Sequence, residues 1–83
     1  MELQELIQTE INQHLEAENI NTVLLRDSKV YGVAGATIYK IIHYNYIPSK
    51  TTIKKLLDGF GYTYNIGFTG FENVKKKDDE NSN

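Results

Sequence analysis

The chain has 83 residues, a net charge of −2 and no cysteine, so one domain is expected, and disulfides and thiolate metal sites are excluded. No apolar run approaches the roughly 18 residues of a membrane span, and the acidic, periodic start MELQELIQTE does not resemble a signal peptide. We therefore expect a cytoplasmic protein with no membrane partner.

Two helices are predicted in the first part of the chain. Apolar residues at helical spacing, with Glu and Gln between them, indicate an amphipathic helix over about residues 2–18. The stretch ENINT ends it, and Asn21 or Thr22 can cap a second helix over about residues 22–31. Gly32 then follows, as glycine often does at the end of a helix.

Two more helices are predicted on either side of Pro48. The helix over about residues 35–44 has an inner face of Ile38, Ile41 and Ile42. Pro48 ends this run because the residue before a proline is disfavoured in helical geometry. Ser49 can cap the next helix, over residues 50–60, and Gly61 closes it.

The stretch YTYNIGF, residues 62–68, predicts a single strand because its β-favouring side chains alternate. One face carries Tyr62, Tyr64, Ile66 and Phe68. A lone strand needs a partner for its backbone donors and acceptors, so we expect it to pair with its own copy in a homodimer. A second copy would also enlarge the core, because a domain of this size buries only about 60% of its unfolded surface.

These elements together predict a mainly α fold of four helices followed by one short β-strand. Residues 1–68 would form the folded domain with its dimerisation strand. Residues 69–83 are polar and then wholly charged or amide-rich, which predicts a tail that is disordered from about Lys75.

The basic side chains gather in the middle of the chain. Residues 20–77 contain all nine Lys and Arg but only three acids, a net charge of +6, whereas residues 1–19 carry five acids and no base. Basic residues on one face would raise the affinity for phosphates whatever the net charge of the whole chain. An ordinary solvated surface is the alternative interpretation.

Catalytic and metal-binding motifs are absent from the sequence. It contains no G-x-S-x-G motif and no phosphate-cradling glycine loop, and His14 and His43 stand 29 residues apart with no carboxylate pattern around either. We therefore expect no enzyme, no cofactor and no metal site.

A family resemblance is carried by YGVAGATIYKIIHYNYIPSKTTIKKLLDGFGY, residues 31–62. A glycine turn at Gly32, a buried residue at Ile38, Pro48-Ser49 opening a helix and Phe60-Gly61 closing it follow one known pattern. The stretch resembles the lambda-repressor-like (XRE-type) helix-turn-helix DNA-binding domains, clearly so over about residues 20–61. The resemblance implies a four-helix lambda-repressor-like domain whose recognition helix, over about residues 35–44, lies in the DNA major groove.

The resemblance also implies which residues face double-stranded DNA. They are Thr22, Gly35, Ala36, Thr37, Tyr39, Lys40, His43, Tyr44, Asn45 and Lys50. Ala36 or the Thr37 methyl could meet a thymine methyl, and Lys40 could reach guanine acceptors or a phosphate. Tyr39 and Tyr44 could bond phosphates. Thr22 would offer its hydroxyl and backbone donors at a helix start.

The resulting hypothesis is a small transcriptional regulator, a repressor or autorepressor that binds a palindromic operator as a homodimer. GYTYNIGF is similar to the strand that pairs across a two-fold axis in some antitoxin and regulator members of the family, which would place Tyr62, Tyr64, Ile66 and Phe68 at the dimer interface. The alternative is a protein-interaction module on the same scaffold, such as an antitoxin or a phage-encoded inhibitor. Its acidic first helix and DDENSN tail could face a basic toxin or host factor.

Overall fold

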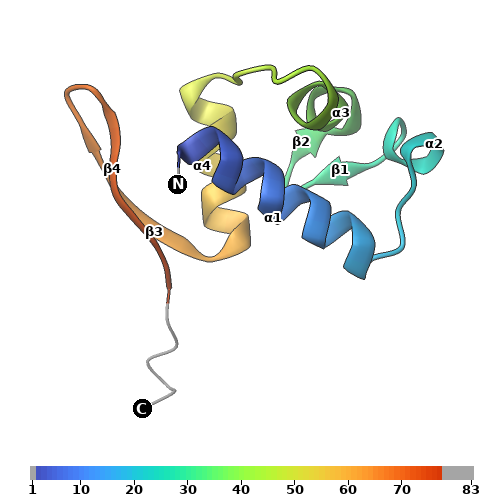
Figure 1. Cartoon of the computed structure of the whole chain (residues 1–83), viewed down its shortest axis with the longest axis horizontal. Coiled ribbons are helices and arrows are strands. Elements are labelled where there is room, and N and C mark those ends of the chain that lie inside the picture. Colours follow the sequence, from blue (N-terminus) through green and yellow to red (C-terminus); the bar gives the residue numbers. More distant parts are fainter. Residues whose placement is uncertain (1, 78–83) are drawn as a thin grey trace, which may run out of the picture.

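The computed structural model describes residues 2–77 as four helices and two small antiparallel hairpins (Figure 1). The elements in chain order are α1 (Leu3–Ala17), α2 (Thr22–Leu25), β1 (Lys29–Val30), β2 (Val33–Ala34), α3 (Gly35–His43), α4 (Lys50–Phe60), β3 (Tyr62–Gly67) and β4 (Gly70–Lys76). In Figure 1 the β3–β4 hairpin stands at the left, apart from α2, β1, β2 and α3 at the right. The molecule therefore has a helical body with a projecting hairpin.

The core lies between α1, α3 and α4, with the first hairpin closing one side. Its fully or almost fully buried apolar residues are Ile7, Ile11, Leu15, Leu25, Val30, Val33, Ile38, Ile41, Ile53, Leu56 and Leu57. The helical spacing in α1, α3 and α4 brings each apolar stripe to the same interior. The predicted helix faces are therefore confirmed for these three helices.

Local capping explains several helix ends. The Asn21 side chain accepts hydrogen bonds from the Val23 and Leu24 amides at the start of α2. Ser49 accepts from the Thr52 amide at the start of α4, and Gly61 ends α4 in the left-handed region with φ +84°. These caps confirm the helix starts and the α4 end predicted from the sequence.

The second predicted helix is wrong beyond Leu25. Residues 29–34 form a hairpin instead, with Val30 paired to Val33. Tyr31 and Gly32 both have positive φ, as in the two-residue turns whose twist matches that of antiparallel strands. Gly32 therefore belongs to a hairpin turn between α2 and α3. The pairing forms because the two valines bury their side chains in the core, a tertiary contribution that outweighs the helical pattern.

The prediction of a mainly α fold with one strand is also wrong, because β3 pairs with β4 of the same chain in an α+β fold. The expected tail thus begins inside this hairpin, and only its residues 78–83 lie outside the described part. Phe71 and Val74 of β4 pack against the core.

The bulge between Thr63 and Asn65 sets two residues of β4 against one of β3, and Asn73 takes a positive φ there. This bulge interrupts the alternation of apolar and polar side chains in β4, so the sequence pattern did not indicate a strand there.

The start of α3 lies against the end of α2 at backbone distance. Gly35 is buried, and its amide donates to the Ser28 carbonyl at 2.9 Å. A Cβ at this position would overlap the carbonyl of Leu25 and lie 3.0 Å from the Ser28 oxygen. Glycine is therefore required for α2 and α3 to approach this closely.

Replacing Gly35 with Ala should lower the free energy of unfolding by about 3 kcal/mol, because backbone atoms would have to move to admit the methyl group. Gly61→Ala is the matched control: its left-handed φ costs about 1 kcal/mol, but no atom lies within 4 Å of the added Cβ. Urea unfolding measures both. A loss for Gly35→Ala no larger than that for Gly61→Ala would contradict the close approach.

Candidate nucleic-acid interface

The outer face of α3 carries several of the residues that the family resemblance assigned to DNA. Ile38 and Ile41 point into the core, so the residues at the intervening helical positions form the opposite face. That face consists of Ala36, Tyr39, Lys40 and His43, all exposed except the half-buried Tyr39. It contains no carboxylate. An α-helix of this kind fits the width of the DNA major groove.

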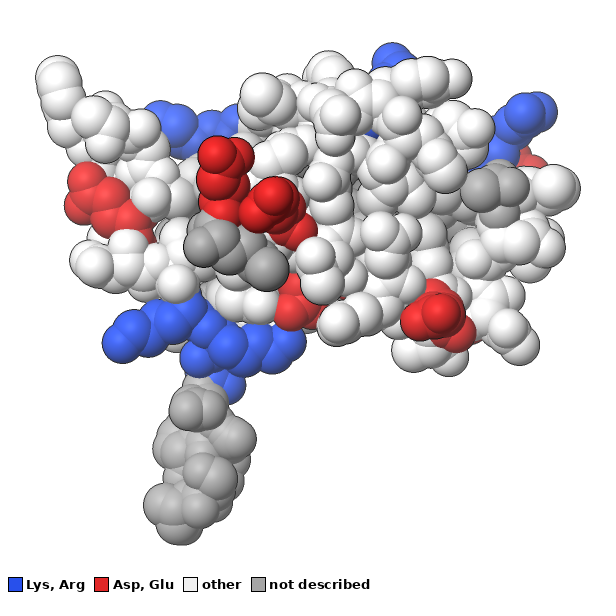
Figure 2. Space-filling model, in the orientation of Figure 1, with Lys and Arg blue, Asp and Glu red and all other residues white. Residues whose placement is uncertain are grey.

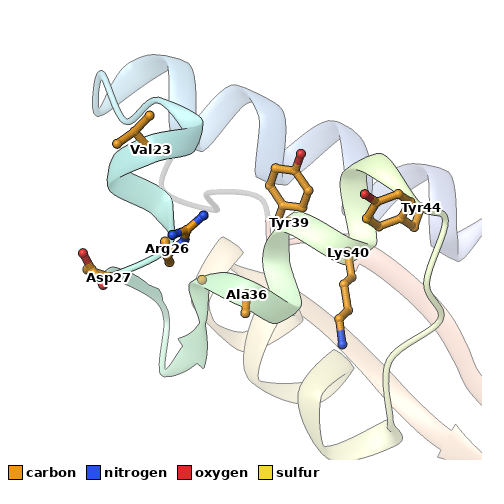
Figure 3. A pocket seen from close by; sticks show the side chains of 8 residues that line it. Val23, Arg26, Asp27, Ala36, Tyr39, Lys40 and Tyr44 are labelled. Carbon is orange, nitrogen blue, oxygen red and sulfur yellow. The ribbon is translucent and has the colours of Figure 1, made fainter.

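A cleft of about 520 Å³ lies beside this face, between α2 and α3 (Figure 3). It is lined by Val23, Arg26, Asp27, Gly35, Ala36, Tyr39, Lys40 and Tyr44. In Figure 3 the Arg26 side chain points from the end of α2 toward α3, whereas the Asp27 carboxylate points away. The cleft thus has a cationic side chain directed into it and its one acid directed outward.

Aromatic rings cluster at the end of α3 that leads into the α3–α4 loop. The ring centroids of Tyr39 and His43 are 4.3 Å apart, and those of Tyr39 and Tyr44 are 6.0 Å apart. Lys40 Nζ lies 5.8 Å from the centre of the Tyr46 ring, within the range of a cation–π contact. These contacts hold the side chains of the outer face in defined positions.

Helix α1 fixes the end of α3 and the loop that follows it. Gln8 Nε2 donates to the Ile41 carbonyl at 2.8 Å and to Asn45 Oδ1 at 2.9 Å. Gln4 Nε2 donates to the Tyr46 carbonyl at 2.9 Å. Asn45 takes a positive φ of 54° at this bend. Its side-chain oxygen is therefore directed to α1 and is already bonded within the chain.

The structure brings together only some of the predicted DNA-facing residues. The cleft gathers Gly35, Ala36, Tyr39, Lys40 and Tyr44. Thr37 is half-buried, and His43 lines a second cavity, between α1 and the end of α3. Asn45 and Lys50 lie farther along, in the loop and at the start of α4. Beside Thr22, the Val23 and Leu24 amides are already bonded to Asn21, so the start of α2 offers few free donors.

Sequence reasoning missed Arg26 and Val23 as members of the site. Arg26 is the C-cap residue of a helix that spans only four residues. In the longer helix that the sequence predicted, the direction of its side chain could not be assigned. Val23 is an exposed apolar residue, 77% accessible, and residues of this kind ordinarily point inward. The unusual placement of a valine at the outer side of α2 becomes visible only in the structure.

The four residues assigned to a dimer interface divide into two pairs. The Tyr62 hydroxyl donates to Glu10 at 2.6 Å, and the Tyr64 hydroxyl donates to Asp58 at 2.7 Å. Ile66 is 51% exposed and Phe68 fully exposed near the tip of the hairpin. The tyrosines thus attach the hairpin to the helices, and the two apolar side chains beyond them stay uncovered.

Both tyrosine hydroxyls hold their protons more firmly than free tyrosine does. Burial, together with the hydrogen bond and negative charge of Glu10, raises the pKa of Tyr62 to about 12. The hydrogen bond to Asp58 is the main cause of the raised pKa of Tyr64. Lys76 Nζ also reaches Glu10, at 3.3 Å. Glu10 therefore ties both strands of the hairpin to α1.

Comparisons with known proteins leave the function to be argued from the chain's own residues. No protein-family model, curated protein or solved structure matches the chain. Within residues 2–77, no three His, Asp or Glu side chains come together as metal ligands would. None of the helices in the same described part is long and apolar enough to cross a membrane.

Replacing Tyr62 with Phe should lower the free energy of unfolding by about 1 kcal/mol at neutral pH, through loss of the hydrogen bond to Glu10. Because folding raises the pKa of Tyr62 from 10.0 to about 12, the unfolded chain loses this proton first as the pH rises. The stabilisation is complete below pH 10 and is lost between pH 10 and about 12. The difference between the two proteins should therefore shrink over that window.

Urea unfolding of the wild type and Tyr62→Phe across this pH range measures the effect. A difference that stays constant up to pH 12 would show that the Tyr62–Glu10 bond is not the cause.

Proposed function

We propose that the protein is a small sequence-specific DNA-binding regulator, a repressor or autorepressor that presents α3 to the major groove and acts in the cytoplasm. The main support is the outer face of α3, which sets Tyr39 and Lys40 beside a cleft that Arg26 enters from α2. The resemblance of residues 31–62 to lambda-repressor-like domains favours the same face of α3.

The distribution of charge makes the side on which α1 lies in front the less suitable one for DNA. Figure 2 views the molecule from the side on which α1 lies in front, and acidic side chains are prominent there. Lys and Arg are seen mainly at the upper and right margins and where β4 ends. Segregated charge of this kind would orient a polyanion even though the whole chain is slightly acidic.

The proposed division of roles follows from side-chain length. Lys40 reaches base edges or phosphates, and Tyr39 donates to a phosphate. Ala36 is short, so the backbone of α3 can lie close to the bases, with its methyl group against a thymine methyl. Few donors point outward, so selectivity rests on one or two side chains and on DNA shape.

Selection of bound sequences from random DNA, followed by anisotropy titration of the selected duplex, tests this function. Tyr39→Ala and Lys40→Ala should each weaken binding about tenfold, since a specific contact contributes about 1–3 kcal/mol. Lys77→Ala removes an exposed lysine beyond the end of β4 and should change affinity less than twofold. Unaltered binding by both α3 variants, with folding intact by circular dichroism, would refute the assignment.

We propose in addition that the regulator is a homodimer formed along β3. The sequence predicted a dimer because β3 lacked a partner strand, but β4 of the same chain pairs with β3. The dimer is therefore proposed for a different reason. Each strand of this sheet still has one open edge. The β4 edge carries Lys75 and Lys76 and the bulge at Asn73, features that block further pairing. The β3 edge has no charged residue and continues to the exposed Phe68. An antiparallel β3–β3 pair would give a four-stranded sheet.

Size-exclusion chromatography with light scattering at micromolar concentration tests the dimer, which should have about twice the 9.5 kDa mass of the chain. Ile66→Lys should shift it to the monomer by placing a charge beside the paired edge. Val23→Lys is the matched control, because it changes an exposed apolar residue on α2, outside the hairpin. A wild-type protein that elutes as a 9.5 kDa monomer argues against this interface.

A protein-interaction module remains the second candidate, and one observation favours it. Val23, Tyr44 and Ile47 are 77%, 70% and 72% exposed, whereas DNA-binding surfaces are polar and strongly basic. The buried centre of a protein interface is more apolar than the rest of the surface and is enriched in aromatic residues. A toxin or host factor would then be the partner. Binding to DNA phosphates falls steeply with salt, so a partner held equally well at high salt would favour the second candidate.

A further inference from the structure

The α2–α3 cleft is large enough to hold a small molecule. Its volume of about 520 Å³ lies in the range of about 300–1,000 Å³ found for small-molecule sites. Gly35 and Ala36 contribute almost no side chain to the lining, so a planar ligand can lie close to the backbone of α3. The cleft can therefore hold a whole nucleotide.

The aromatic lining suits a nucleobase. Tyr39 and Tyr44 approach at an angle of 60° with ring centroids 6.0 Å apart. Tyr44 is 70% exposed, so much of its ring is free to stack. Every base has a π-face, and stacking on an aromatic side chain is therefore tolerant of sequence.

The cationic groups of the cleft suit a phosphate. Arg26 points into the cleft, and Lys40 lines it as well. Within residues 2–77 the only ion pair joins Lys76 to Glu10, so Arg26 is not neutralised by a carboxylate in the described part. The one acid of the lining, Asp27, points away. A guanidinium offers paired donors that match phosphate oxygens.

We propose that this cleft binds a single nucleotide unit, with the base against Tyr39 and Tyr44 and the phosphate against Arg26. The unit is either a free mononucleotide or one residue of an unpaired strand. Because Tyr39 and Lys40 serve the DNA surface too, a nucleotide in the cleft excludes duplex DNA from α3. This regulatory consequence rests on the proposed function, whereas nucleotide binding itself does not.

Amide chemical shifts of the ¹⁵N-labelled chain, followed during titration, test the proposal. The probes are dAMP, adenosine, deoxyribose 5-phosphate and a short single-stranded oligodeoxyadenylate. Saturable shifts around Arg26, Ala36 and Tyr44 are expected with dAMP below about 10 mM, the weak end of specific binding. Adenosine and deoxyribose 5-phosphate should each bind more weakly than dAMP, because each lacks one of the two recognised groups.

Two variants and a control assign the two halves of the ligand. Arg26→Gln should weaken dAMP binding about tenfold and leave adenosine unchanged, through loss of a charged hydrogen bond. Tyr44→Leu should weaken both dAMP and adenosine. Lys29→Gln removes an exposed cation that does not line the cleft and should leave both affinities within about twofold. Thermal unfolding verifies that each variant is folded.

The outcomes separate the ligand sources and the two proposals. An oligodeoxyadenylate that binds about tenfold more tightly than dAMP identifies an unpaired strand as the ligand, and equal affinities identify the free nucleotide. The absence of saturable shifts with every probe, or an equal effect of Arg26→Gln and Lys29→Gln, overturns the inference. If the chain binds duplex DNA but its amide shifts do not change with any nucleotide probe, the proposed function holds and nucleotide binding is refuted. If the amide shifts change with nucleotide but duplex DNA does not bind, nucleotide binding holds and the proposed function is refuted.

Discussion

The backbone contact between Gly35 and Leu25 is the constraint on which the rest of the candidate site depends. It sets the end of α2 against the start of α3, with no room for a side chain between them. Arg26 follows Leu25 directly, and Ala36 follows Gly35. The two walls of the cleft therefore begin at the contact itself, and the position of the arginine relative to the outer face of α3 follows from it.

Helix α1 positions the two surfaces that the proposals use. Its inner face packs into the core through Ile7 and Ile11, which are completely buried. Between them along the chain, Gln8 bonds to the end of α3 and Glu10 bonds to the β3–β4 hairpin. One rigid element thus sets the orientation of both the DNA-facing helix and the strand proposed for dimerisation. A change of angle between these surfaces would alter the spacing of two recognition helices in a dimer.

The surface around the cleft is chemically mixed, and this explains why three kinds of ligand compete as interpretations. Lys40 and Arg26 favour a phosphate, while Tyr44 offers an aromatic face and Val23 an aliphatic one. A DNA duplex would contact Lys40 and Arg26, and a protein partner would contact Tyr44 and Val23. A nucleotide would contact one residue of each kind, Arg26 and Tyr44. Salt separates a protein partner from the two phosphate-bearing ligands, because binding dominated by phosphate contacts falls steeply as the salt concentration rises.

The sequence by itself determined α1, α3 and α4 with their buried faces and the caps at Ser49 and Gly61, because helical periodicity and capping depend on near neighbours. The assignment of Ala36, Tyr39, Lys40 and His43 to the DNA-facing side came from the family resemblance. Only the tertiary structure decided where α2 ends, because Val30 gains more by burial in a hairpin than by continuing a helix. It likewise decided that β4 forms at all: the lysines at its end resemble a disordered tail, yet Lys76 reaches Glu10 of α1. The tertiary structure also decided the direction of the Arg26 side chain, because that direction depends on contacts between α2 and α3 that no local sequence pattern encodes.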